Sequence, residues 1–191
     1  MNYIVKLAAI LTVVTSVSGA ALSLVNRITK PRIEQQQRLV TERALTEALP
    51  QANKEAIIPV KTGDQVLYYK GFASADTTQL VGYAFLAVGK GYSSDIITMV
   101  GVDTNGIIQG IKIISQIETP GLGSKIEEIR YGEETSWFQK QFIGRSGKEL
   151  AVDKDGGTII SVTGATISSR AVTNSIKKAL AELEQKVSEF K

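Results

Sequence analysis

The sequence predicts an α+β domain, an antiparallel meander sheet with flanking helices, preceded by one N-terminal transmembrane helix. Three observations support this prediction. An uncharged, mostly apolar run of 20 residues lies near the N-terminus, at Leu7–Asn26. The middle of the chain alternates apolar and polar residues in short runs between turn residues, and the C-terminal segment carries apolar residues at helical spacing.

The N-terminal run is long enough to span a bilayer, because 20 helical residues extend about 30 Å. Basic residues flank it on both sides, namely Lys6, Arg27, Lys30 and Arg32. The alternative is a cleaved signal peptide with Ser18-Gly19-Ala20 as its cleavage site. We favour a retained anchor, since the apolar run continues to Val25, beyond the roughly 7–15 residues of a signal peptide core. Residues 1–33 are therefore expected to form the anchor and its flank. Pro31 is expected to end the membrane helix, because proline cannot continue the helical hydrogen bonding.

The composition excludes several classes of function. The chain has no Cys and no His, so disulfides, thiolate or imidazole metal sites, Cys-ligated iron–sulfur clusters and Ser-His-Asp or Cys-His nucleophilic centres are excluded. A carboxylate-only metal site stays open. With 22 Lys plus Arg against 19 Asp plus Glu, spread along the chain, we expect no nucleic-acid partner. We assign no catalytic residue and no metal ligand.

After the anchor, residues 34–64 are expected to form a helical connector, with a helix over Glu34–Leu49 and a turn bracketed by Pro50 and Pro59. Residues 65–191 form the main domain. Its first part reads as four strands, and Asp103-Thr104-Asn105-Gly106 is a hairpin turn, because Asn and Gly tolerate positive φ. The strands are expected at Gln65–Tyr69, Leu80–Val88, Ile96–Val102 and Ile107–Ile114.

The C-terminal part of the domain begins with a Pro- and Gly-containing loop, Glu118–Gly123. A helical turn near Ile126–Tyr131, an amphipathic stretch at Ser136–Ile143 and a short strand at Thr158–Val162 are expected after it. The last helix is expected over about Ser168–Val187. Its buried face is expected to carry Val172, Ile176, Ala179, Leu180, Leu183 and Val187.

Three stretches remain as candidates for chemistry. The first is the hydroxyl-rich junction Thr163–Ser169, where a helix N-terminus can hold a phosphate, or where Thr166 or Ser168 merely caps the helix. The second is the Glu118–Gly123 loop with Lys125, onto which a flat ring can stack, or which is a plain connection. The third is Gly89-Lys90-Gly91-Tyr92, which lacks the spacing of a phosphate loop and reads as a tight turn.

Taken in order, these stretches resemble the FMN-binding domain family whose flavin is attached by a phosphoester to a threonine. The family's attachment sequence is Ser/Thr-Gly-Ala-Thr, which Thr163-Gly164-Ala165-Thr166 matches; Gly91-Tyr92 and Glu118-Thr119-Pro120-Gly121-Leu122-Gly123 match its upstream motifs. The resemblance covers about Leu80 to Leu183. Within the family, the length and single span are most similar to the G subunits of Rnf-type ion-translocating electron-transport complexes. These are homologous to the C subunits of sodium-pumping NADH:quinone oxidoreductases.

The resemblance implies covalent FMN on the Thr166 hydroxyl, attached by a separate flavin transferase; the lack of His and Cys agrees with an external catalyst. It implies a ring cleft between this junction and the Glu118–Gly123 loop, with Tyr92 as a stacking partner. Lys125 either stabilises the reduced flavin or is an ordinary surface lysine. The expected cofactor-binding residues are Thr166, Thr163, Gly164, Ala165, Ser168, Tyr92, Glu118, Thr119, Pro120, Gly121, Leu122, Gly123 and Lys125. The sequence departs from the family at Ile160, six residues before Thr166, where the family often has the Asp that the transferase reads.

The resemblance further implies an electron relay in an Rnf-type ferredoxin:NAD oxidoreductase, with partner membrane subunits, the flavin transferase and the lipid bilayer as partners. Two alternatives stay open: a membrane-tethered flavin relay to extracellular reductases, and a non-redox tethered binding or assembly module. The Lys and Arg count around the span favours a cytoplasmic domain. The family favours the extracytoplasmic side of the cell membrane, and we follow the family because the charge rule is weak for long domains.

Overall fold

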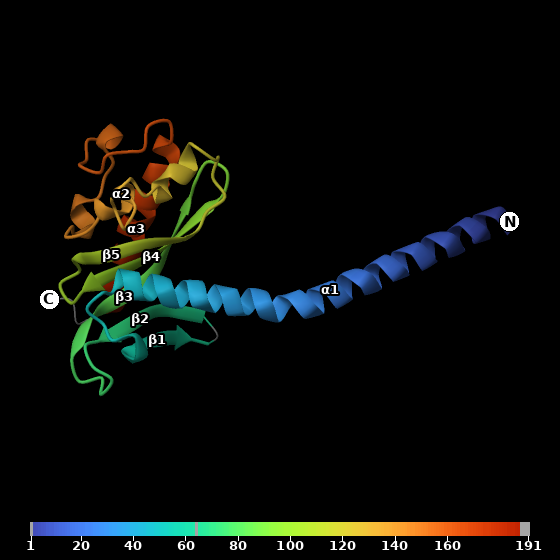
Figure 1. Cartoon of the computed structure of the whole chain (residues 1–191), viewed down its shortest axis with the longest axis horizontal. Coiled ribbons are helices and arrows are strands. Elements are labelled where there is room, and N and C mark those ends of the chain that lie inside the picture. Colours follow the sequence, from blue (N-terminus) through green and yellow to red (C-terminus); the bar gives the residue numbers. More distant parts are fainter. Residues whose placement is uncertain (1, 64, 188–191) are drawn as a thin grey trace. The chain divides into compact units, whose positions relative to one another are not determined.

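The computed structural model describes residues 2–63 and 65–187. The chain divides into two compact units, Met1–Val40 and Thr41–Lys191. The first unit lies within α1 (Asn2–Ala48), and the second contains the last turns of α1 together with the sheet and the remaining helices (Figure 1). The antiparallel sheet with helices confirms the predicted fold class.

Helix α1 is long and apolar enough to cross a membrane, and its side chains are exposed from Asn2 to Val40. The expectation that Pro31 ends the helix is wrong, because α1 continues through it to Ala48. Proline removes one backbone N–H from the helical ladder. The following residues, 32–48, are rich in Glu, Gln, Arg, Leu and Ala, which favour the helix and carry it past this defect.

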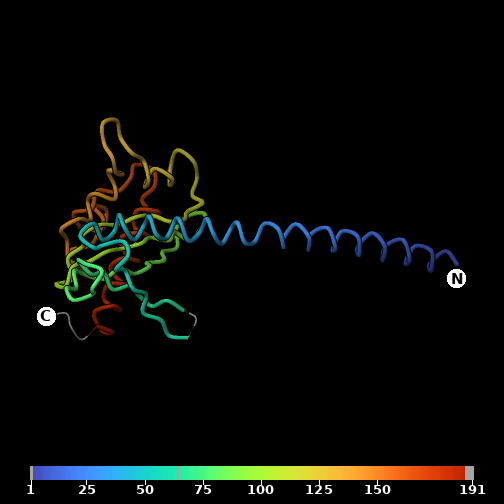
Figure 2. The backbone as a smooth tube through the Cα atoms, turned by 60° about the horizontal axis from the view of Figure 1, so that its bottom comes forward, coloured from blue at the N-terminus to red at the C-terminus, as the bar shows by residue number. Residues whose placement is uncertain are grey.

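The sheet is a five-stranded meander in the order β1-β2-β3-β4-β5, with every neighbouring pair antiparallel. The strands are β1 (Ile57–Thr62), β2 (Gln65–Phe72), β3 (Leu80–Lys90), β4 (Asp95–Asp103) and β5 (Ile108–Ser115). Strand β2 pairs with β3 only over Tyr69–Phe72, so the tip of the β1–β2 hairpin diverges from the rest of the sheet (Figure 2). The four predicted strands are confirmed.

The two faces of the sheet carry separate cores. On one face, α3 (Thr166–Lys186) packs its predicted apolar stripe against alternate residues of β3 and β4. On the other face, Ala44, Leu45 and Ala48 of α1 pack on Ala84 and Met99. Two glycines of the sheet allow this second contact, because a Cβ on either would meet the backbone oxygen of Ala48 or Glu47 at 2.5 Å or less; they are Gly101 and Gly110.

Several local expectations need correction. The segment 34–64 is helical only to Ala48 and contains β1, so the sheet has one strand more than predicted. Thr158–Val162 is not a strand, since one parallel bridge joins Val152 and Ile159 there. Helix α3 begins at Thr166, two residues before the predicted start. The remaining helices are short, namely α2 (Trp137–Lys140) and 3₁₀ turns at Lys54–Ala56, Gly123–Glu127, Gly147–Glu149 and Asp153–Asp155.

Candidate functional site

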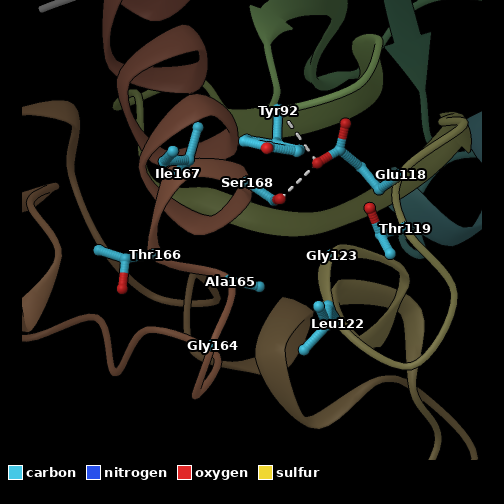
Figure 3. A pocket seen from close by; sticks show the side chains of 10 residues that line it. All are labelled: Tyr92, Glu118, Thr119, Leu122, Gly123, Gly164, Ala165, Thr166, Ile167 and Ser168. Atoms are coloured by element: carbon cyan, nitrogen blue, oxygen red, sulfur yellow. Dashed lines mark hydrogen bonds between the residues drawn. The ribbon is translucent and has the colours of Figure 1, made fainter.

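A cavity of about 440 Å³ opens where three distant segments meet: the turn after β3, the loop after β5 and the first turn of α3 (Figure 3). This volume lies within the usual range for small-molecule sites. The cavity is lined by Tyr92, Glu118, Thr119, Leu122, Gly123, Gly164, Ala165, Thr166, Ile167 and Ser168. Its lining combines apolar side chains, hydroxyls and one carboxylate.

The junction before α3 is a tight turn fixed by its own hydrogen bonds. Gly164 has φ of +78°, a conformation that residues with a Cβ rarely adopt. Ser169 Oγ accepts a hydrogen bond from Val162 N at 2.9 Å and donates to Ala165 O at 3.0 Å. The N-cap residue of α3 is Ala165, and no side chain caps the helix. Capping therefore does not explain the hydroxyls of Thr166 and Ser168.

The first turn of α3 is suited to an anion. The first intrahelical bond runs from Ser169 N–H to Ala165 O, so the three N–H groups before it have no partner within the helix. The first turn contains no acidic residue that would compensate its partial positive charge. Thr166, the first residue of the helix, is half-buried and lines the cavity beside these groups.

Glu118 connects the three segments of the site. Its Oε1 accepts hydrogen bonds from Ser93 N at 2.9 Å and Ser94 N at 3.1 Å, and its Oε2 accepts one from Tyr92 N at 3.1 Å. Ser168 Oγ, in the first turn of α3, donates a short hydrogen bond to the same Oε2. Glu118 is 5% exposed. Its carboxylate thus ties the turn after β3 to the N-terminus of α3.

Opposing effects act on the pKa of Glu118. Burial alone raises it, but the hydrogen bonds from Ser168 and from the three backbone N–H groups outweigh burial and hold the pKa below its ordinary value. Two glycines make this close packing possible. A Cβ at Gly91 would lie 2.5 Å from Oε1, and a Cβ at Gly123 would lie 2.7 Å from both Glu118 Cβ and Ser168 Oγ.

Nine of the thirteen residues expected from the sequence line the cavity, and sequence reasoning missed Ile167. Its position between Thr166 and Ser168 at the helix start is the signal that could have identified it. The structure leaves Thr163, Pro120, Gly121 and Lys125 outside the lining. All four are exposed, and they support the turns rather than the cavity wall. Tyr92 is on the wall and 73% exposed, as a residue at a cavity mouth would be.

The surroundings of Ile160 are also defined. Its backbone N–H donates to Gln141 Oε1 at 2.8 Å and its carbonyl accepts from Gln141 Nε2 at 3.1 Å, while its side chain is 60% exposed. Next to it, Asp153 accepts a hydrogen bond from Ser161 N at 3.1 Å. The hydrogen bonds from Ser161 hold the pKa of Asp153 below its ordinary value. An ionised carboxylate therefore lies beside position 160, contributed by a different part of the chain.

Known proteins resemble the chain over most of its length. Residues 91–181 match the family model for the FMN-binding domain, and residues 1–48 match the RnfG N-terminal region. The G subunit of the Na⁺-translocating ferredoxin:NAD⁺ oxidoreductase complex of Acetobacterium woodii is 30% identical over 92% of this chain and 89% of that protein. The G subunit of the ion-translocating oxidoreductase complex of Shewanella loihica is 34% identical over 93% of this chain and 88% of that protein.

A solved structure shares the fold. The C subunit of the Na⁺-translocating NADH-quinone reductase of Parabacteroides distasonis superposes with a TM-score of 0.52 at 21% identity. The match covers 78% of this chain and 93% of that one. At this identity the likeness concerns the fold, and it agrees with the predicted combination of a meander sheet and flanking helices.

Proposed function

The chain belongs to the family of G subunits of ion-translocating oxidoreductase complexes, and we propose that it is the membrane-anchored flavoprotein that relays electrons within such a complex. In the Acetobacterium woodii relative, the complex is named for electron transfer between ferredoxin and NAD⁺. We propose the same type of complex for this chain, with FMN joined by a phosphoester to Thr166. The other membrane proteins of the complex are its partners.

The main support for this proposal is that Thr166 lines a cavity at the N-terminus of α3. A phosphodiester at Thr166 keeps one negative charge, and the N–H groups that lack helical partners in the first turn of α3 suit such a charge. Leu122 and Ile167 offer apolar surface to a flat ring, and Tyr92 offers an aromatic one. The donor set and the cavity volume therefore fit FMN.

Bound FMN would supply the redox chemistry, and the residues of the chain would hold and tune it. We propose that a separate flavin transferase forms the ester, which agrees with the absence of His and Cys that could activate the Thr166 hydroxyl. The ionised Asp153 beside Ile160 offers an acidic group where the family often has one in the sequence itself. We propose that α1 anchors the protein in the cell membrane by a single span, with the large domain on the extracytoplasmic side.

The test compares Thr166 with a threonine outside the motif. Thr166→Val is expected to abolish flavin that survives denaturation, because it removes the hydroxyl that forms the ester. Thr104→Val makes the same change at an exposed residue of the turn between β4 and β5, outside the motif and the cavity lining, and is expected to keep the flavin. In-gel flavin fluorescence and peptide mass report the attachment, with one FMN less water added to the peptide that contains Thr166. Stoichiometric flavin on Thr166→Val would show that the attachment site is elsewhere.

The same preparation separates the alternatives. A wild-type chain from its native host that carries no flavin would favour a tethered binding or assembly module. A flavinylated chain that purifies without multi-span membrane proteins would favour a relay to extracellular reductases. Flavinylation together with such proteins is the result that we expect.

A further inference from the structure

We propose that Glu118 is a positioning residue that fixes an uncompensated negative charge on the wall of the cavity and thereby lowers the reduction potential of the flavin held there. The inference rests on the proposed function, because it concerns the same cavity. It assigns to Glu118 a role different from direct binding of the cofactor. Figure 3 shows Glu118 pointing toward Ser168 and Tyr92 at the cavity wall, with dashed lines to both.

The charge on Glu118 is held in one place. Three backbone N–H groups of one turn, at Tyr92, Ser93 and Ser94, converge on the carboxylate and form an anion-binding nest. Ser168 adds a fourth donor from α3. Such donors stabilise the ionised form and leave the neutral form poorly matched, because a protonated oxygen would face a backbone N–H. The carboxylate therefore stays ionised while it is buried.

The same packing keeps the carboxylate against the cavity. Because Gly91 and Gly123 have no Cβ, the backbone packs closely around the Glu118 side chain; a Cβ on either would overlap its oxygens. Glu118, Gly123 and Ser168 all line the cavity. Movement of the carboxylate would break its hydrogen bonds to the turn after β3 and to the first turn of α3.

The charge is satisfied by hydrogen bonds, and no cation among the described residues neutralises it. Its donors are N–H groups and a hydroxyl, which carry no net charge, whereas an Arg or Lys partner would cancel the field of the carboxylate. Of the two lysines nearest to Glu118 in the sequence, Lys112 pairs with Glu47 at 2.8 Å, and Lys125 is exposed; neither lines the cavity. A group in the cavity therefore experiences the field of a carboxylate that neither lysine neutralises.

The consequence for electron transfer follows from charge. Reduction of a bound flavin ring by one electron adds one unit of negative charge unless a proton from solvent follows it. A fixed carboxylate on the cavity wall raises the free energy of that added charge and leaves the oxidised, neutral ring almost unaffected. The chain thus makes the flavin harder to reduce and a stronger electron donor once reduced.

The experiment measures the midpoint potential of the flavin in the full-length protein, purified in detergent after co-expression with the transferase. Dithionite supplies the electrons, and flavin absorbance reports the reduced fraction. Glu118→Gln keeps the shape and removes the charge, so its midpoint potential is expected to shift to a higher value. Ser168→Ala keeps the charge and removes one donor, so it weakens the same contacts and is expected not to raise the potential.

A second pair of variants covers the case in which Glu118→Gln fails to fold. Thr119→Lys places a cation beside the carboxylate, at an exposed position on the cavity wall. Thr119→Met introduces a neutral side chain of comparable length at the same position. Thr119→Lys is expected to have the higher potential of the two. This pair leaves the donors of Glu118 in place and tests whether a charge at this part of the cavity wall changes the potential of the flavin.

The outcomes separate this inference from the proposed function. Wild-type protein without flavin contradicts the proposed function. Flavinylated Glu118→Gln with an unchanged or lower potential overturns the inference, as does an equal rise in Ser168→Ala, which would assign the effect to lost packing. Equal potentials in Thr119→Lys and Thr119→Met overturn it as well. A rise in Glu118→Gln and in Thr119→Lys, each relative to its control, supports it.

Discussion

Replacing Ser168 with alanine removes the hydroxyl that α3 donates to the buried carboxylate of Glu118. A hydrogen bond to a charged group is worth about 1.5–3 kcal/mol, and Glu118 is too deeply buried for water to replace the lost donor easily. For a unit of this size, the loss corresponds to a fall in the melting temperature of about 3–12 °C. The matched control is Ser175→Ala, the same change at a buried position of α3 whose hydroxyl donates to Val172 O at 2.9 Å. A neutral bond of this kind contributes about 0.5–1.5 kcal/mol.

The pH dependence of the stability lost in Ser168→Ala shows whether the ionised carboxylate of Glu118 is the cause. Because the folded-state pKa of Glu118 lies below its ordinary value of about 4.3, its ionised form stabilises the fold fully above that pH. This contribution declines as the pH falls through the folded-state pKa. Ser168→Ala removes one cause of the lowered pKa, so its destabilisation is expected to be largest at neutral pH and to shrink in acid. The effect of Ser175→Ala is expected to stay constant.

The assay is thermal unfolding of the full-length protein in detergent, followed by the fluorescence of the chain's one tryptophan, Trp137. Its ring is half-buried in the second unit, with the Arg130 guanidinium 4.2 Å from the ring centroid, so its emission reports the folding of that unit. Melting temperatures of wild type and both variants are compared at pH 7 and at successively lower pH, down to the acid unfolding of the wild type. A loss for Ser168→Ala that stays constant over this range, or a loss no larger than that of Ser175→Ala, would refute the account of Glu118 as an ionised buried group.

Two further predictions concern packing and topology. Gly123→Ala is expected to destabilise the second unit by about 1–3 kcal/mol in the same assay, because the added Cβ would lie 2.7 Å from Glu118 Cβ and Ser168 Oγ; a wild-type melting temperature would show that the loop relaxes freely. Because the chain lacks cysteine, Lys148→Cys, at an exposed position of the large domain, and Asn2→Cys, before the span, can be labelled individually. A membrane-impermeant maleimide added to intact cells is expected to label Lys148→Cys alone, and labelling of Asn2→Cys alone would place the domain in the cytoplasm.

The sequence predicted the central sheet and the last helix well, because both follow strong local patterns. Period-two alternation and the turn at Asp103–Gly106 define the meander from β3 to β5. On the predicted apolar stripe of α3, Val172, Ile176 and Leu180 are fully buried, whereas Ala179 is only partly buried. In these elements, a residue's neighbours in the sequence determine its burial, so a pattern over a few residues is sufficient.

The two wrong expectations, for Pro31 and Pro59, have a common cause: the structural effect of a proline depends on the fold around it. Pro59 was expected to bound a turn, but it lies in β1, which is an edge strand and tolerates a residue without an N–H. Pro31 was expected to end a helix, but it lies in an exposed helix with favourable residues on both sides. Which edge of a sheet stays unpaired is a property of the whole fold, and a local pattern does not contain it.

The site was predictable in its segments but not in its contacts. The family motifs identified the three segments that form the cavity, and nine of the residues named from them line it. Glu118 was expected to bind the cofactor, yet its carboxylate is engaged by a turn 24–26 residues before it and by Ser168, 50 residues after it. Contacts over such separations depend on how the sheet and α3 come together. The alternative of a helix cap at Thr166 or Ser168 is excluded by the same contacts, because no side chain caps α3 and Ser168 bonds to Glu118.

The site has two anion-binding features, both formed by backbone N–H groups, and they differ in the group that occupies them. The N–H groups of Tyr92, Ser93 and Ser94 converge on a carboxylate that the chain itself supplies. The first N–H groups of α3 lack helical partners and face a cavity whose only acidic lining residue among those described is Glu118, already engaged. The described lining residues add no second carboxylate there. Under the proposed function, the phosphate joined to the Thr166 hydroxyl would supply the negative charge that the first turn of α3 lacks.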